Sequence, residues 1–131
     1  MRTSRIILCL ALLVMVAGCK SSFNTAPVLD INEHNIIQDI SAANVEKCIK
    51  NAGDRLGWQM VTVSPGVIEA TLYNRQHTAV VTIPFSRTKY SILYKSSINL
   101  YAEGGTIHKS YNRWVRNLEK EIGIELSRVS R

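Results

Sequence analysis

The chain has 131 residues, of which 46% are hydrophobic and 20% are charged, and its formal net charge is +6. This length suits a single domain, and the composition excludes both a disordered and a collagen-like chain. Three Cys are too few for a disulfide scaffold. The hydrophobic residues are unevenly spread, because residues 6–18 form one unbroken apolar run behind Arg2 and Arg5.

Residues 1–18 have the organisation of a secretory signal peptide, with a basic start and small residues ending the apolar run. The run is shorter than the roughly 20 residues that a transmembrane helix needs, and no polar residue interrupts it as in an amphipathic core helix. The segment Val16-Ala17-Gly18-Cys19 resembles the lipobox of bacterial lipoproteins. The resemblance implies cleavage between Gly18 and Cys19, a diacylglycerol thioether on Cys19 and an acyl chain such as palmitate on the new amine. The alternative is an ordinary secreted protein in which Cys19 occurs by chance.

Several acyl chains on one residue make membrane attachment durable. Residue 20 is Lys rather than Asp, and by resemblance to enteric sorting this favours the outer membrane, facing the periplasm. Cleavage would remove Cys9 and lipidation would consume the Cys19 thiol, which leaves Cys48 as the remaining thiol. Because Cys48 falls on the apolar face of a predicted helix, we expect a buried core Cys rather than a redox or nucleophilic group.

The charges of the mature part are unevenly distributed. Residues 28–72 carry a net charge of −3, and residues 73–118 carry a net charge of +6. A basic segment raises nucleic acid as a partner, but a periplasmic lipoprotein rarely meets nucleic acid, so none is expected. Anionic lipid or another envelope protein is the expected partner, and a merely solvated basic surface is the alternative.

We expect residues 19–40 to be the lipidated N-terminus and tether, with a short extended piece near residues 28–31, and residues 41–131 to be the single domain. Ser41 is a suitable N-cap for a helix that runs to Leu56 and ends at Gly57. Its apolar positions recur on one face. They are Val45, Cys48, Ile49, Ala52 and Leu56.

Four extended runs follow, at residues 58–64, 67–73, 78–85 and 89–96, joined by short turns. Their period-two alternation predicts an antiparallel meander. Pro84 cannot donate to a sheet ladder, so its strand is expected to end there or to lie at an edge. The face away from the core would be half apolar, with Glu69, Thr71, Tyr73, Thr78, Val80, Thr82, Ser91, Leu93 and Lys95.

A connector at residues 97–106 contains Gly104-Gly105, which we interpret as a turn. Helical periodicity begins at Ile107, and the helix either ends at Gly123 or continues to Leu126. Its apolar stripe comprises Ile107, Tyr111, Trp114, Val115, Leu118 and Ile122. The predicted fold is therefore α+β, in the order α-β-β-β-β-α, with three to four antiparallel strands and two helices packed on one face.

Nothing in the sequence points to catalysis. The three His are scattered without metal-ligand spacing, and no nucleophile elbow or phosphate-binding loop is present. We therefore expect no metal site, no cofactor and no enzymatic activity.

Several segments together look like a family of small Gram-negative lipoproteins to which no activity is assigned. The resemblance covers about residues 42–126 and implies an α+β meander without catalytic residues to transfer. Asn99 and Asn112 would be hydrogen-bonding corners, or Asn112 would line a small polar pocket with Ser97 or Asn99. The segments that carry the resemblance are 57–58, 68–72, 79–85, 90–94, 97–100 and 111–114.

The leading hypothesis is a non-enzymatic, membrane-anchored interaction module. Its candidate interaction surface is the open sheet face with a basic rim, represented by Tyr73, Arg75, Leu93 and Lys95. The alternative is a module that binds a small ligand or lipid in a groove formed by Tyr73, Leu93 and Lys95. A pocket larger than about 300 Å³ would favour the ligand-binding module, and a flat, half-apolar sheet face would favour the interaction module.

Overall fold

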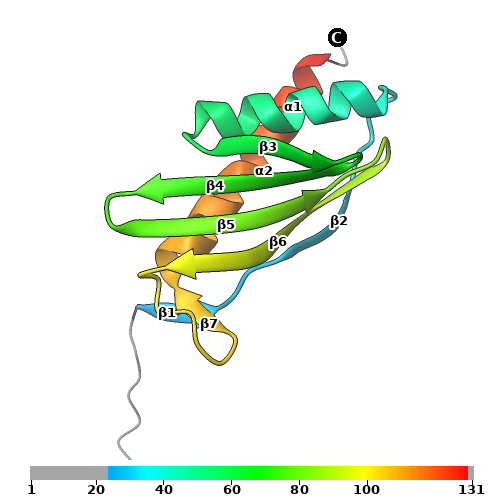
Figure 1. The fold of residues 1–131 in the computed structure, drawn as a ribbon. Coiled ribbons are helices and arrows are strands. Elements are labelled where there is room, and N and C mark those ends of the chain that lie inside the picture. The colour runs from blue at the N-terminus through cyan, green and yellow to red at the C-terminus, as the bar shows by residue number, and fades with distance from the viewer. Residues whose placement is uncertain (1–23, 130–131) are drawn as a thin grey trace, which may run out of the picture.

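The computed structural model describes residues 24–129, so the signal peptide and the lipobox-like segment with Gly18 and Cys19 lie outside the described residues. The domain contains two helices, a five-stranded antiparallel sheet and a separate two-stranded sheet (Figure 1). The predicted α+β class is confirmed. The predicted number of strands is too low, because three short strands join the four of the meander.

The four meander strands lie close to their predicted positions. They are β3 (Gln59–Ser64), β4 (Val67–Asn74), β5 (His77–Pro84) and β6 (Lys89–Ile98). Each pairs antiparallel with the next. A fifth strand, β2 (Ile31–Asn35), pairs with β6 and gives the order β2-β6-β5-β4-β3.

The segment expected to be a tether contains regular structure. Strand β1 (Thr25–Pro27) pairs with β7 (Thr106–His108), with Ala26 opposite Ile107. The carbonyl of Asn24 also accepts a 2.8 Å hydrogen bond from the Lys109 amide. Together with β2, this places much of residues 24–35 in the folded domain, which therefore begins well before the predicted boundary at residue 41.

The first helix, α1 (Ala42–Arg55), begins as predicted. The Ser41 hydroxyl accepts a hydrogen bond from the Asn44 amide, and this satisfies one of the free donors of the first turn. Gly57 follows the helix with φ at +83°, a conformation that glycine adopts without steric cost. The predicted inward face is buried except for Leu56, which lies at the C-cap and remains 37% exposed.

The second helix, α2 (Lys109–Val129), begins two residues later than predicted because Ile107 belongs to β7. The helix continues through Gly123, where a Cβ atom would have no neighbour within 4 Å. Figure 1 shows α2 crossing behind the sheet, while α1 runs along β3. The buried residues of α2 are Tyr111, Val115, Leu118, Ile122, Glu125 and Leu126.

The core lies between the helices and one face of the sheet. Alternate residues of the strands are buried against the helices, as the period-two pattern predicts. They include Ile68, Ala70, Leu72, Ala79, Val81, Ile83, Tyr90 and Ile92. Strand β3 pairs only with β4, so its outer edge is a free edge of the sheet.

Two predicted corner residues make hydrogen bonds to distant backbone. The Asn112 side chain donates to the Pro27 carbonyl and accepts from the Leu29 amide, at 2.8 and 3.0 Å. The Asn99 side chain donates to the Gln76 carbonyl at 2.8 Å. Asn112 therefore connects α2 to the backbone at Pro27 and Leu29, and it does not line a pocket with Ser97 or Asn99.

Candidate functional site

The face of the sheet that points away from the helices carries exposed apolar side chains. Val61 is 57% exposed, Tyr73 is 62% exposed and Ile98 is 60% exposed. Their register partners Glu69 and Thr78 point to this face. We call this surface the open face. It also carries the half-buried Val67, Val80 and Leu93 and the exposed Val63.

The charges of the open face compensate each other. The Lys95 ammonium forms an ion pair with the Glu69 carboxylate of the neighbouring β4. The predicted basic rim is therefore not assembled here, because Lys95 is paired and Arg75 lies in the turn after β4. The predicted surface residues Tyr73 and Leu93 do lie on the open face, which is apolar and close to neutral.

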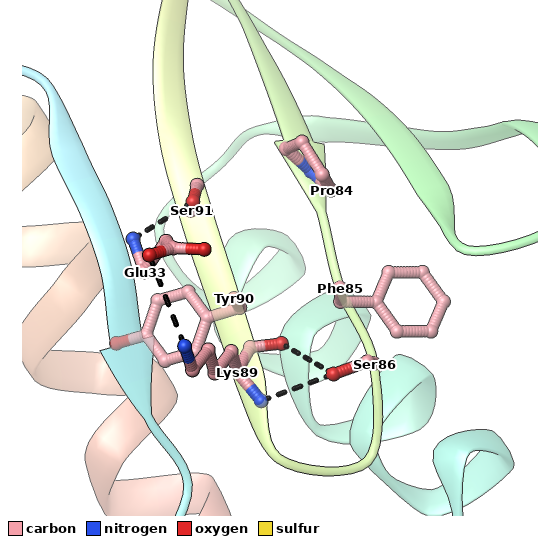
Figure 2. A pocket seen from close by; sticks show the side chains of 7 residues that line it. All are labelled: Glu33, Pro84, Phe85, Ser86, Lys89, Tyr90 and Ser91. Atoms are coloured by element: carbon pink, nitrogen blue, oxygen red, sulfur yellow. Dashed lines mark hydrogen bonds and ion pairs between the residues drawn. The ribbon is translucent and has the colours of Figure 1, made fainter.

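A first hollow of about 260 Å³ lies beside the turn between β5 and β6. Figure 2 shows the Phe85 ring pointing away from the other labelled side chains. The Glu33 carboxylate pairs with the Lys89 ammonium at 3.8 Å, and the Ser86 hydroxyl accepts from the amides of Thr88 and Lys89. Because these polar groups already serve the turn and one another, few of them are available to a ligand.

A second hollow of about 420 Å³ separates residues 28–30 and Tyr94 from the loop at residues 102–106. Gly104 and Gly105 both have positive φ there and form the predicted turn. The Asp30 carboxylate accepts from the Tyr94 amide at 2.8 Å. This hollow exceeds the roughly 300 Å³ that would favour a ligand-binding module, so the structure supports that alternative in volume. The predicted groove residues Tyr73, Leu93 and Lys95 do not line it, and Tyr94 is the one residue of β6 that does.

A third hollow of about 270 Å³ has a different chemical character. It lies between the β4–β5 turn and the first turns of α2, and we call it the basic pocket. Its lining residues come from these two segments, which are distant in the sequence. They are Asn74, Arg75, His77, Ser110, Arg113 and Trp114.

The basic pocket holds two arginines without a counter-charge. Neither Arg75 nor Arg113 forms an ion pair within residues 24–129, and no acidic side chain lines the pocket. One Arg113 nitrogen donates to the Ser110 hydroxyl at 3.2 Å. Arg75 occupies a left-handed backbone conformation, with φ at +56°, in which a side chain costs energy relative to glycine.

Histidines fix both walls of the basic pocket. His77 Nδ1 donates to the Asn99 carbonyl at 2.7 Å, since a carbonyl oxygen can only accept. His108 Nδ1 accepts from the Ser110 amide at 3.1 Å and so caps the start of α2. The two rings stack with their centroids 6.4 Å apart. This contact joins the first residue of β5 to the last residue of β7, directly before α2.

Two buried tyrosines and the exposed His34 take part in packing. Burial raises the pKa of the Tyr90 and Tyr111 hydroxyls, and neither hydroxyl has a hydrogen-bond partner among the described residues. His34 stacks on Tyr90 and lies 3.1 Å from the Glu119 carboxylate, which holds β2 against α2. Residues 24–129 contain no group of three or more His, Cys, Asp or Glu side chains that could hold a metal ion.

Cys48 is 1% exposed, as predicted for a core residue. Burial raises the pKa of its thiol, and the Glu125 charge adds to this effect. We expect the native protein to resist a thiol reagent such as dithionitrobenzoate at pH 8, because the thiolate is the reactive form. A Lys47→Cys variant, which places a thiol on the exposed side of the same helix, should react at once. Equal rates for the two thiols would contradict the buried state.

Sequence reasoning identified Arg75 but missed the other members of the basic pocket. His77, Ser110, Arg113 and Trp114 meet Arg75 only when the β4–β5 turn packs against α2. The excess of positive charge in residues 73–118 was the available indication. It did not reveal which cations share a hollow.

Comparisons with protein-family models, with curated proteins and with solved structures find no match to this chain. Within the part of the chain that the structure describes, neither helix has the length and apolar character needed to cross a membrane.

Proposed function

We propose that this chain is a lipid-anchored module of the bacterial envelope, held at the outer membrane and facing the periplasm, that binds another envelope protein and catalyses no reaction itself. The observation that carries the proposal is the open face, where four apolar side chains, those of Val61, Val63, Tyr73 and Ile98, are each more than half exposed. The lipobox-like segment ending at Cys19 supports the anchor.

The open face fits a partner with an uncharged, apolar surface. Val61, Val63 and Ile98 are each more than half exposed, and burying such side chains contributes about 25 cal/mol per Å² of apolar surface. The one ion pair on this face is already satisfied, so a partner needs no charge of its own there. Exposed apolar patches commonly mark binding sites on soluble proteins, and four exposed apolar side chains share this face.

Photocrosslinking in intact cells tests this proposal. A photoreactive phenylalanine derivative at Val61 and, separately, at Ile98 should capture the same protein, because both positions lie on the open face. The matched control places the same residue at Lys47, on the exposed side of α1. We expect no adduct from Lys47.

A second crosslinking experiment places a charge on the open face. Val63→Glu should abolish the crosslink from Ile98 without lowering the melting temperature, because Val63 is 53% exposed. If the crosslink persists, the open face is not the docking surface. An adduct at twice the chain's own mass would identify a second copy instead of a different envelope protein, and this would contradict the proposal.

The ligand-binding alternative is supported by the hollow of about 420 Å³ beside Gly104 and Gly105. It would hold a small molecule between Val28 and Tyr94 rather than in the predicted groove of the sheet. The open face remains the stronger argument, because the carboxylate of Asp30 in this hollow already binds the Tyr94 amide.

A further inference from the structure

The start of α2 lies close to the point where the lipid anchor would leave the domain. The Asn24 carbonyl binds the Lys109 amide, the first residue of α2. Four residues lie between Cys19 and Asn24, so five chain steps join them, and each step spans at most about 3.6 Å. With Cys19 lipidated, the bilayer surface therefore lies within about 18 Å of this end of the domain.

The same end of the domain carries unpaired positive charge. Six of the twelve Lys and Arg residues within residues 24–129 form ion pairs, and six do not. Four of the unpaired cations follow one exposed stripe of α2, spaced at four, three and four residues. They are Lys109, Arg113, Arg116 and Lys120. The stripe points away from the buried face, which contains Val115 and Leu118.

We propose that the basic pocket binds the phosphate of an anionic lipid headgroup in the membrane that holds the anchor. This inference rests on the proposed lipid anchor and adds a specific contact between the folded domain and the bilayer. Arg75 from the β4–β5 turn and Arg113 from α2 supply the charge. The Ser110 hydroxyl accepts from Arg113 and can donate its own proton to a ligand.

The lining of the pocket suits an oxyanion, and its place beside the proposed anchor favours the phosphate of a lipid headgroup. Guanidinium groups bind phosphate oxygens through paired, charge-assisted hydrogen bonds. Trp114 lines the same pocket and is half-buried, and Trp is enriched where protein meets the headgroup layer of a membrane. The anchor supplies the headgroups at short range, so the local concentration of ligand is high.

Binding can be measured on the full-length lipidated protein in dodecyl maltoside micelles. Trp114 is the natural reporter, and a Trp58→Phe background leaves it as the only tryptophan of the chain. Dihexanoyl phosphatidylglycerol should change the Trp114 emission saturably. Dihexanoyl phosphatidylcholine, whose choline neutralises the phosphate, should not. An equal response to both lipids would overturn the proposal, and so would the absence of a saturable response to phosphatidylglycerol.

Two charge-matched variants separate the pocket from general attraction. Arg75→Gln with Arg113→Gln should weaken binding of phosphatidylglycerol at least about tenfold, because both charge-assisted donors are lost. Arg116→Gln with Lys120→Gln removes the same charge from α2 outside the pocket, and it should weaken binding less than about threefold. Equal losses in the two variants would show diffuse attraction and overturn the pocket. If the double variant folds poorly, Arg113→Lys provides the test instead. This variant keeps the charge but loses the forked donor, and it should also weaken binding.

Inorganic phosphate distinguishes a lipid headgroup from a free anion. If phosphate binds as tightly as phosphatidylglycerol, the pocket serves a soluble anion and the membrane assignment is wrong. Incorporation of labelled palmitate reports on the anchor independently of the pocket. Palmitate incorporation without binding of phosphatidylglycerol would overturn the pocket alone. Lipid binding without palmitate incorporation would overturn the anchor.

Discussion

Replacing Cys19 by Ser should abolish lipidation, so that the protein either stays an unprocessed precursor with its apolar leader or, once the leader is cleaved, leaves the membrane fraction. The sulfur of the lipobox Cys is the atom that accepts diacylglycerol, and the hydroxyl oxygen of Ser does not accept it. Durable attachment needs more than one acyl chain, each buried CH₂ contributing about 0.8 kcal/mol. Labelled palmitate should enter the wild-type protein and not the variant.

Cys9→Ser is the matched control, because it alters a Cys of the same leader that cleavage would remove. This variant should be lipidated and sedimented with membranes like the wild type. Retention of the Cys19→Ser variant in the membrane fraction after an alkaline carbonate wash, with its leader cleaved, would contradict lipid anchoring at Cys19.

Removing both arginines that pair with Glu125 should destabilise the domain by about 3 kcal/mol. The Glu125 side chain is only 7% exposed, and its carboxylate binds Arg55 of α1 at 2.9 Å and Arg128 of α2. Arg55→Met with Arg128→Met would leave a buried negative charge without a partner. Urea unfolding followed by circular dichroism measures the loss.

Adding Glu125→Leu to the double variant should restore most of the stability, because the unpaired charge is then gone and the position stays apolar. Arg87→Met tests an exposed ion pair, with Asp39, and should have little effect. If the double variant is no less stable than Arg87→Met, the Glu125 cluster does not stabilise the contact between the helices.

The meander was predictable because buried and exposed residues alternate without interruption along β4 and β5. Strands β1 and β7 were not predictable, since each has three residues and neither has an alternating pattern of its own. Strand β2 has the polar sequence INEHN, and most of its residues are exposed. These three strands form because a distant segment supplies hydrogen-bond partners, as Asn112 does for the backbone at Pro27 and Leu29.

The end of α2 illustrates how tertiary packing overrides local preference. Gly123 costs up to about 1 kcal/mol inside a helix relative to Ala, and the sequence alone allows the helix to end there. Ile122 and Leu126 on either side of it are buried, and their packing carries the helix on to Val129. The basic pocket was unpredictable for a related reason, because Arg75 and Arg113 are 38 positions apart in the sequence and meet only in the folded chain.

The position of β3 determines in which direction the sheet could grow. Its sequence, QMVTVS, contains neither a charge nor a proline, the residues that commonly discourage an edge from accepting a further strand. Four strand spacings of about 4.8 Å separate it from β2, which lies at the opposite border of the sheet. Figure 1 places β1 and β7 on the β2 side. The chain enters the domain on the β2 side, through β1, so a polypeptide that extended the sheet along β3 would add on the border opposite to the one where the described chain begins.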